Sequence, residues 1–310
     1  MKRFLAGIII LSLVGIIGCA KPQNHGDNIV VTIGAMPDVE SVPFIIALKN
    51  GYFEEENVQV KIEQFKSAQD RDSALQSGVL DGVVTDILAV AFANEGGIDL
   101  RIIAKSDGNI NLVSGASSGI KTINELTDRS VGLSTNTVMD YTLDKMLEAK
   151  HVNPKDIQKI AIPPLPTRLE MLQAEKIDAA ILPEPFAGIA INDGANVLMN
   201  TNEMGYKAGV IAFTAQSLID NPDQIKSVFK AYNKAVEYLA NNPREDYIDY
   251  IIEKQGFPSE VKQFIVLPQY SNAEPPEEKV VLDVVEWLID KNLIKTPFNY
   301  QTLVDEKVLR

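Results

Sequence analysis

Short apolar runs alternate with amphipathic segments over most of the chain. Val30–Gly34 predicts a strand, and Pro43–Asn50 has helical spacing, with a proline near its start and a glycine just past its end. Val131–Leu133 and Val138–Lys150 repeat this order about 97 residues later. Strands that alternate with helices of these lengths indicate βαβ units and parallel sheets.

A faint internal repeat indicates two units of this kind. Arg71–Gln76 (RDSALQ) returns as Arg168–Gln173 (RLEMLQ). Three further similarities keep the same order and nearly the same offset: residues 79–84 with 176–181, Ile33-Gly34 with Val131-Gly132, and residues 57–62 with 156–162. Two open α/β sheets whose strands end at one crevice are expected to form a binding site between two lobes.

The C-terminal third does not repeat the unit. It predicts a strand at Gly209–Phe213, where the chain returns to the first lobe. Three amphipathic helices are expected after it, starting after Asn221-Pro222, near Tyr247 and after Pro275-Pro276. Their apolar stripes, which include Trp287, favour core packing over a partner surface.

These patterns together predict an α/β fold with two lobes. We expect mostly parallel sheets flanked by helices, and a ligand cleft between the lobes. The expected first lobe is 29–112 plus 213–310, which includes the C-terminal helices, and the expected second lobe is 113–212.

The chain begins with the pattern of a bacterial export signal. Residues 1–18 contain a basic start and an apolar run too short to span a bilayer. Ile16-Ile17-Gly18-Cys19 resembles the lipobox of bacterial lipoproteins, which implies that Cys19 becomes the lipidated first residue. The alternative is an ordinary secretory signal with a chance cysteine. Residues 19–28 are polar and predict a flexible tether, so we expect an extracytoplasmic protein that is lipid-anchored to the bacterial cell membrane.

Charge and residue usage narrow the functions. Removal of residues 1–18 takes away two basic residues, so the net charge moves from −13 to −15, which argues against nucleic acid as a partner. Cys19 is the single cysteine, and His25 and His151 are the two histidines. The chain thus lacks the usual residues for a metal cluster or a nucleophile–base pair. We expect no metal, no cofactor and no enzyme activity.

Motifs along the chain resemble one family of transport proteins. They are Ala47-x3-Gly51-Tyr52-Phe53, Val58-x-Val60, Ala74-Leu75-x2-Gly78-x2-Asp81-Gly82, Asp86, Ile177-Asp178-Ala179-Ala180, Pro183-Glu184-Pro185-Phe186-Ala187 and Trp287-Leu288-x4-Leu293-Ile294. The pattern is similar to the extracytoplasmic substrate-binding proteins of sulfonate, taurine, nitrate and thiamine-pyrimidine ABC importers. The resemblance implies a type II periplasmic-binding-protein clamp, a small-molecule ligand, and an ABC permease with its cytoplasmic ATPase as partner. It implies no particular ligand.

Two arginines occupy equivalent places in the repeat. Arg71 and Arg168 each follow a residue that can cap a helix, Asp70 and Thr167. Thr167-x-x-Glu170 is a capping-box pattern that puts Arg168 at the first helical position, where a cation opposes the helix dipole. An anionic group between the lobes would explain such arginines. The alternative is local pairing with neighbouring carboxylates at the surface.

Polar loops precede the expected helices in both lobes. Ser134, Thr135, Asn136 and Thr137 lie between a strand and a helix, where hydroxyls and free backbone N–H groups can bind an anion or a polar group. Plain N-capping is the alternative. The counterpart in the first lobe contains Asp38 and Ser41, each of which can cap a helix or contact a ligand.

Carboxylates follow the equivalent third strands, at Asp86 and Glu184. Each can hold an amine, a ring N–H or a hydroxyl, although Asp86 can instead cap the next helix. Their presence beside the arginines argues against a purely anionic ligand and favours a zwitterion, or a ring with donors and acceptors. Tyr141 can stack on such a ring, with core packing as the alternative.

The favoured interpretation is a monomeric solute-binding lipoprotein that closes on a small solute and delivers it to an ABC permease. Two alternatives remain. One is a membrane-tethered ligand sensor, and the other is an enzyme, because pyrimidine-synthesis and menaquinone-pathway enzymes resemble the same family. The export signal and the scarcity of histidine argue against the enzyme.

Overall fold

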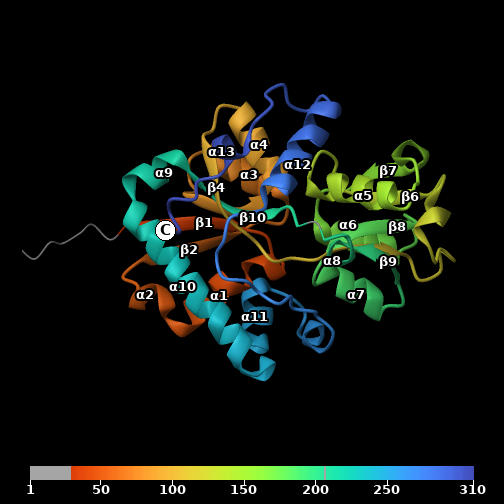
Figure 1. Ribbon diagram of the computed structural model, residues 1–310. Helices are drawn as coiled ribbons and strands as arrows, with labels where there is room; N and C mark the ends of the chain where they lie inside the picture. Colours follow the sequence, from red (N-terminus) through yellow and green to blue (C-terminus); the bar gives the residue numbers. More distant parts are fainter. Residues whose placement is uncertain (1–28, 206) are drawn as a thin grey trace, which may run out of the picture.

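Two five-stranded sheets form the centres of two lobes (Figure 1). The structure is a computed structural model that describes residues 29–205 and 207–310, so the expected export signal, Cys19 and the tether lie outside the described residues. Across the first sheet the strands are β2 (Gln59–Gln64), β1 (Val30–Ala35), β3 (Gly82–Asp86), β10 (Gly209–Thr214) and β4 (Leu100–Lys105). Across the second they are β7 (Gln158–Ala161), β6 (Ser130–Leu133), β8 (Ala179–Pro183), β5 (Ile110–Ser114) and β9 (Asn196–Asn200).

Helices cover the sheets of both lobes (Figure 1). The helices that belong to the first lobe are α1 (Val42–Asn50), α2 (Tyr52–Glu55), α3 (Ala68–Gln76), α4 (Ile87–Glu95), α9 (Ala215–Asp220), α10 (Pro222–Asn241), α11 (Ile248–Gln255), α12 (Glu278–Asp290) and α13 (Tyr300–Leu303). The second lobe carries α5 (Val138–Ala149), α6 (Leu165–Gln173), α7 (Phe186–Asn192) and α8 (Thr201–Met204). In the described part of the chain, no helix combines the length and the hydropathy needed to cross a membrane.

The apolar spacing of the long helices matches their packing. Phe44 of α1 and Tyr232 of α10 are fully buried in one cluster against the first sheet, with ring centroids 5.2 Å apart. Leu88 of α4 and Val284 of α12 belong to a second cluster that also contains residues of the same sheet. The predicted C-terminal helices therefore do pack as core, as their stripes indicate.

Each sheet is mixed, with four strands in one direction and one strand in the opposite direction. In the first sheet β1 runs parallel to β2 and β3, whereas β10 runs antiparallel to β3 and β4. The second sheet repeats this arrangement, with β5 antiparallel to β8 and β9. The other four strands of each sheet run in one direction, so the expectation of mostly parallel sheets is confirmed. β10 and β5 are the exceptions because each enters its sheet from the other lobe. They therefore run opposite to strands such as β3 that end near the crevice.

The chain crosses between the lobes twice, and both crossings fall earlier than the sequence indicated. The first lies between Lys105 and Ile110, and the second lies between Asn200 and Gly209. Residues 110–112 thus pair within the second sheet and residues 209–212 within the first, so the expected boundaries at 112 and 212 are too late by a few residues.

The internal repeat is visible in matching contacts. Arg71 Nη1 donates to the carbonyl of Val84 at 3.1 Å, and Arg168 Nη1 donates to the carbonyl of Ile181 at 2.8 Å. A Cβ at Gly34 in β1 would lie 2.7 Å from Leu80 Cδ1 and 3.3 Å from Arg71 Cγ, and one at Gly132 in β6 would lie 2.5 Å from Ile177 Cδ1 and 3.3 Å from Arg168 Cγ. Each arginine stem therefore packs closely over the equivalent strand of its own sheet, β1 or β6.

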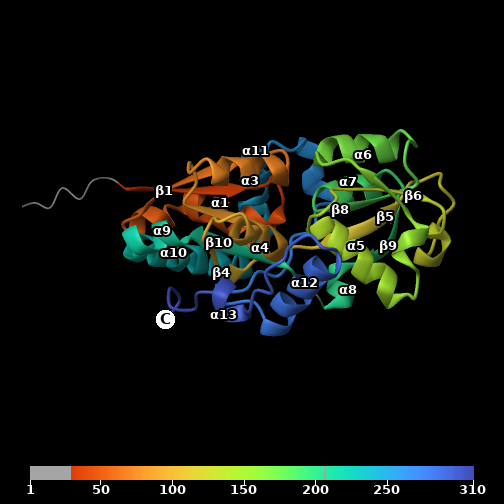
Figure 2. The ribbon, with the colours of Figure 1, turned by 90° about the horizontal axis from the view of Figure 1, so that it is seen from above.

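Helix α12 of the first lobe lies against α5 of the second (Figure 2). The rings of Tyr141 and Trp287 meet edge to face, with centroids 5.7 Å apart. Lys145 Nζ lies 3.0 Å from Asp283 Oδ1 across the same contact. The two lobes thus touch outside the crossings as well as through them.

Candidate functional site

A cleft between the lobes is lined by residues from both sheets. Its empty volume is about 670 Å³, including the part open to solvent. Six of the eleven expected ligand-contact residues line it: Asp38, Arg71, Asp86, Ser134, Thr137 and Arg168. The lining residues that sequence reasoning missed are Met36, Glu40, Ala68, Val84, Thr85, Ile110, Val138, Met139, Pro163, Leu165, Pro183 and Gly209. The crevice expected at the strand ends is therefore present.

Arg71 lies at the floor of the cleft on the first-lobe side. Arg71 is only 3% exposed, and its Nε donates to Asp72 Oδ1 at 2.9 Å. Its helix α3 is capped by Ser67, whose hydroxyl accepts from the N–H of Asp70, so the capping role expected of Asp70 is wrong. The Nη2 atom lies 2.8 Å from Asp72 Oδ1 but makes no hydrogen bond among the described residues. Arg71 thus lines the cleft with a guanidinium atom that contacts only the Asp72 carboxylate among the described residues.

Arg168 is part of the scaffold rather than a free cation. It is fully buried, and its guanidinium donates to the carbonyls of Ile162 (2.9 Å) and Ile181 (2.8 Å) and to Ser134 Oγ (2.5 Å). Helix α6 starts at Leu165, so Arg168 is not at the first helical position that the capping-box pattern predicted. A proline in the first turn is compatible with that earlier start. Burial lowers the pKa of Arg168 to about 10.

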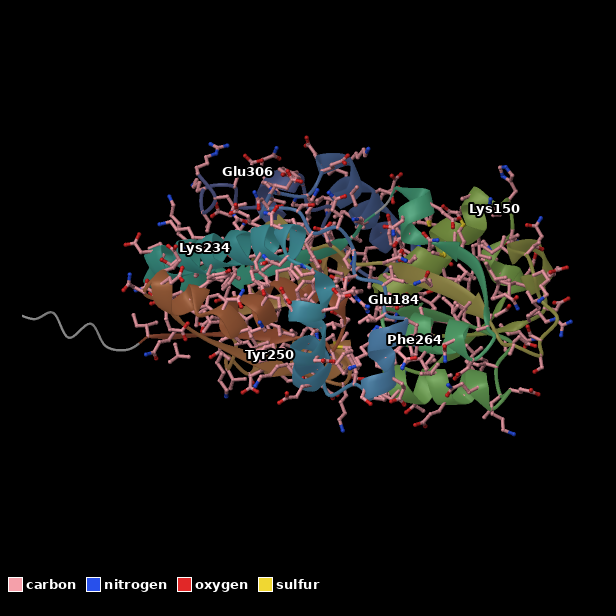
Figure 3. All side chains as sticks on the ribbon, turned by 90° about the horizontal axis from the view of Figure 1, so that it is seen from below. Lys150, Glu184, Lys234, Tyr250, Phe264 and Glu306 are labelled. Carbon is pink, nitrogen blue, oxygen red and sulfur yellow. The ribbon has the colours of Figure 1, made fainter. Side chains whose placement is uncertain are left out.

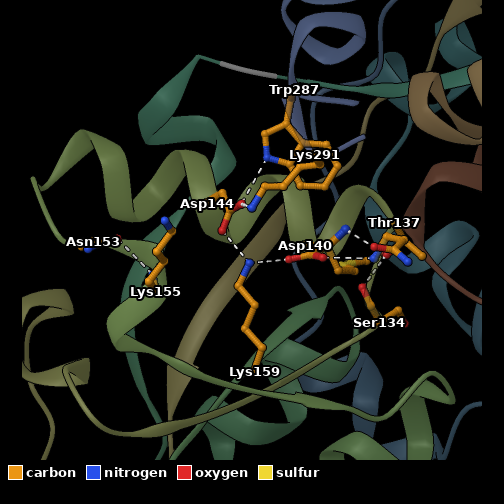
Figure 4. Close-up of polar contacts among 11 residues, drawn as sticks. Ser134, Thr137, Asp140, Asp144, Asn153, Lys155, Lys159, Trp287 and Lys291 are labelled. Atoms are coloured by element: carbon orange, nitrogen blue, oxygen red, sulfur yellow. Dashed lines mark hydrogen bonds and ion pairs between the residues drawn. The ribbon is translucent and has the colours of Figure 1, made fainter. Parts of the chain in front are cut away.

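In the loop Ser134–Thr137, the hydroxyls of Ser134 and Thr137 hydrogen-bond to neighbouring main-chain carbonyls (Figure 4). Thr137 caps α5: its hydroxyl accepts from the N–H of Met139 and donates to the carbonyl of Ser134. Asp140 accepts from the N–H of Asn136 at 3.0 Å. Thr135 and Asn136 are exposed and do not line the cleft, so the capping alternative accounts for most of this loop.

Three carboxylates line the first-lobe side of the cleft. Burial, with the charge of Glu40 next in importance, raises the pKa of Asp38 well above its ordinary value. Burial also raises the pKa of Glu40 to about 7 and that of Asp86 to about 6, with the charge of Arg71 opposing both shifts. The Ser106 hydroxyl donates to Glu40 Oε2. Ionised forms of these groups are therefore costly unless a cation approaches.

Glu40 is the main residue that sequence reasoning missed. Glu40 follows Asp38 by two residues in the same loop, and this closeness to an expected ligand contact is the sequence feature that indicates it. Gly209 allows its approach, because a Cβ there would lie 2.6 Å from Glu40 Oε2. No pattern in the sequence shows that the start of β10 would face this loop, since the two are brought together by the second crossing.

Asp86 caps a helix and lines the cleft, so both roles that its position allows are present. Its Oδ1 accepts from the N–H of Ala89 at 2.9 Å and so caps α4, while the residue also lines the cleft. Beside it, the Thr85 hydroxyl is buried and has no hydrogen-bond partner among the described residues. An unpaired buried hydroxyl at the wall of a cleft is a candidate ligand contact.

Ser41 does not reach the cleft. It is fully buried, and its hydroxyl lies 3.3 Å from the carbonyls of Met36 and Asp38 while it accepts from Gln255 Nε2 at 3.0 Å. Its expected ligand contact is therefore wrong. Instead, Ser41 ties α11 to the loop that carries Asp38 and Glu40.

Tyr141 packs in the core and does not line this cleft, although it lines an adjoining pocket that shares Glu40 and Gly209 with it. Its hydroxyl donates to Asp283 Oδ2 at 2.5 Å, and the residue is 2% exposed. The stacking role expected for it is replaced by its contact with Trp287. The stripe of α5 faces α12 here, which a sequence window over α5 alone does not reveal.

Glu184 lies outside the cleft, next to Phe264 (Figure 3). It is 3% exposed, and its Oε2 accepts from the N–H of Gly188 at 3.2 Å. Burial raises the pKa of Glu184 to about 7. The expected ligand contact is wrong here because the side chain turns back to the start of α7.

Comparisons with known proteins agree with this geometry. The chain resembles the alkanesulfonate-binding protein SsuA from Xanthomonas axonopodis pv. citri bound to MOPS, with a TM-score of 0.76, 16% identity, and coverage of 89% of this chain and 98% of that one. The periplasmic nitrate-binding protein NrtA from Synechocystis PCC 6803 also gives a TM-score of 0.76, at 16% identity, covering 90% of this chain and 86% of that one. The desulfurization enzyme DSZB is similar at a TM-score of 0.68 and 12% identity, covering 90% and 97%.

These structural likenesses show a shared fold of the periplasmic-binding-protein type, as expected. No curated protein sequence matches the chain. The family model described as NMT1/THI5 like matches residues 38–246, which is more than half of the chain and includes both walls of the cleft. The chain therefore belongs to the NMT1/THI5-like family.

Proposed function

We propose that this protein is an extracytoplasmic solute-binding lipoprotein that captures a small organic solute and delivers it to an ABC importer. The observation that carries the proposal is the cleft, which is lined from both lobes and holds a buried hydroxyl, that of Thr85, with no hydrogen-bond partner among the described residues. Such a site can bind a solute by closing around it, and binding of this kind requires no chemical step. A sulfonate-, carboxylate- or pyrimidine-like solute fits its size.

The relatives support this role without naming the ligand. SsuA binds alkanesulfonate and NrtA binds nitrate, as their names state, and both have the same two-lobe fold. A permease with its cytoplasmic ATPase is the partner that the role needs, and we propose that the protein acts as a monomer. Lipid on Cys19 would keep it at the bacterial membrane near that permease.

An enzyme on the same fold is the second candidate, because DSZB is an enzyme with a similar structure. The described residues that line the cleft supply carboxylates, guanidinium groups and hydroxyls, and they include neither histidine nor cysteine. This lining favours binding over nucleophilic chemistry. A tethered sensor would use the same cleft and differs only in its partner.

The test is capture and release. The purified full chain is incubated with a small-molecule extract of bacterial cells and washed, and the retained molecules are released by denaturation and identified by mass spectrometry. We expect one solute, returned chemically unchanged after long incubation. A product that accumulates with time would support an enzyme instead, and no retained molecule would contradict the binding role.

The anchor has its own test. In cells fed labelled palmitate, the wild-type chain is expected to carry label and to sediment with membranes, whereas Cys19→Ser is expected to do neither. Equal labelling of the two proteins would contradict lipidation at Cys19.

A further inference from the structure

The walls of the cleft differ in charge. Three carboxylates, Asp38, Glu40 and Asp86, line the first-lobe side, and the Arg71 guanidinium that lies among them is already paired with Asp72. Asp38 and Glu40 come from the loop after β1, and Asp86 comes from the end of β3. When these carboxylates are ionised, their negative charge exceeds the free positive charge on this wall.

The second-lobe wall offers little compensation. Arg168 is fully buried and its donors are directed to main-chain carbonyls and to Ser134. The Thr137 hydroxyl is engaged in the cap of α5. Much of the remaining wall is apolar and includes Met139 and Leu165. A bare anion placed here would meet no free guanidinium from the second lobe and would face the three carboxylates.

Two buried polar atoms make no hydrogen bond within the described part of the chain. They are the Thr85 hydroxyl and Arg71 Nη2, the second of which contacts only Asp72 in an ion pair of 2.8 Å; their residues are 5% and 3% exposed. Both residues line the cleft beside the carboxylates. Buried polar atoms are costly when unpaired, so they indicate ligand atoms at these positions. Because Arg71 can only donate, the ligand must present an acceptor to it.

We propose, on the basis of the solute-binding function, that the ligand is a small organic molecule with a protonated nitrogen. Asp38, Glu40 and Asp86 hold this nitrogen on the first lobe, an acceptor atom of the ligand faces Arg71 and Thr85, and an apolar part lies against the second lobe. Like charges repel across a dry interface, so the same site discriminates against nitrate and against sulfonates without an amine.

Substitution of the carboxylates gives a test that depends on the sign of the ligand charge. Asp86→Asn and Asp38→Asn keep an oxygen that can accept from the N–H groups of Ala89 and Glu40, so the caps are retained. Asp223→Asn, at an exposed position in the first turn of α10, is the matched control. Thermal unfolding shows that each variant folds.

The measurement is calorimetric titration of these full-length variants with the molecule captured from the bacterial extract. We also use taurine and ethanesulfonate, a pair that differs only by the protonated amine. We expect the captured molecule to contain a basic nitrogen and to bind each cleft variant at least tenfold more weakly than the wild type, with no change in Asp223→Asn. Of the pair, taurine is expected to bind more tightly.

The outcomes separate the two proposals. A captured molecule without a basic nitrogen, or one that binds Asp86→Asn and Asp38→Asn as well as or better than the wild type, overturns the inference about charge and leaves solute binding intact. Tighter binding of ethanesulfonate than of taurine also overturns the inference about charge and leaves solute binding intact. Capture of no molecule from the extract overturns both the inference and the proposed function.

Discussion

Arg71 and Arg168 show how much of a residue's role its position in the sequence can predict. Their places in the repeat are equivalent, as predicted, and each donates to a carbonyl of the third strand of its sheet. Their other contacts differ, because Arg168 also bonds Ile162 and Ser134 whereas Arg71 Nη2 contacts only Asp72 among the described residues. The sequence could not distinguish them, since the partners of Arg168 are main-chain carbonyls that only folding brings within reach.

Replacement of Arg168 is expected to affect stability first. In Arg168→Ala the buried carbonyls of Ile162 and Ile181 lose their donors, which costs about 3 kcal/mol of unfolding free energy. Urea unfolding measures the loss. Arg129→Ala is the control, because Arg129 is exposed and lies 3.7 Å from Asp178, a surface pair worth at most about 1 kcal/mol. Equal stability of the two variants would contradict the scaffold role.

Glu184 gives a prediction about pH. Burial raises its pKa from 4.5 to about 7, so folding favours the protonated form, and stability is lost as the pH rises from about 4.5 through 7. We expect the free energy of unfolding of Glu184→Gln to be about 3 kcal/mol higher than that of the wild type at pH 8, and equal to it near pH 4.5. Urea unfolding at both pH values measures this.

The control for that experiment is Glu170→Gln, an exposed carboxylate in the same lobe. It is expected to leave the difference between pH 4.5 and pH 8 unchanged. If Glu184→Gln also left that difference unchanged, the buried carboxylate would not be its source.

At the scale of elements, hydrogen bonds and ion pairs between α5 and α12 link the two lobes, and we call this contact the clasp. Asp144 of α5 is 1% exposed and accepts from Trp287 Nε1 (3.1 Å), while Lys291 and Lys159 lie 2.7 and 2.5 Å away (Figure 4). Asp283 of α12 bonds the Tyr141 hydroxyl and Lys145 in return. Both helices were predicted from their spacing, but their contact was not, because their partners lie some 140 residues apart.

Weakening this clasp is expected to open the lobes. Asp283→Ala removes the first-lobe carboxylate that bonds Tyr141 and Lys145, so the unliganded protein should show a larger radius of gyration by small-angle scattering. It should also bind its captured solute up to about tenfold more weakly, because less of it is in the closed form. Asp290→Ala, an exposed position at the end of α12, is the control. An unchanged radius and affinity in Asp283→Ala would show that the clasp does not hold the lobes.

At the scale of the whole molecule, the second lobe is one continuous insertion into the first. Its ends meet, since Asn111 pairs with Asn200 across β5 and β9. The first lobe is discontinuous, because β10 lies between β3 and β4 and arrives only after the second lobe is complete. The insertion explains why the repeat in sequence ends where the C-terminal helices begin.

This topology predicts which fragment folds alone. Residues 109–202 contain the whole second sheet and two buried clusters, so we expect circular dichroism of a folded α/β domain and a cooperative thermal transition. Residues 29–109, the control, lack β10 and leave β4 without its neighbour in the sheet, so they should not unfold cooperatively. A folded control or an unfolded 109–202 would contradict this division.

The sequence by itself determined the local elements, the two related units and the family. Alternating apolar runs, proline and glycine at helix ends, and the spacing of the motifs act over short distances, so they can be read without a structure. It also placed Asp38 and Asp86 after strands and Arg71 near the start of a helix, and all three line the cleft.

Only the tertiary structure decided which polar groups face a ligand. Ser41 and Glu184 satisfy neighbouring N–H or carbonyl groups, and Tyr141 packs under α12, although each belongs to a residue type that binds ligands. Conversely, Glu40 lines the cleft because Gly209 leaves room for its side chain. Gly209 belongs to β10, the strand that returns to the first lobe after the second lobe is complete. Burial and pairing depend on contacts between distant segments, and these contacts exist only once both crossings have formed.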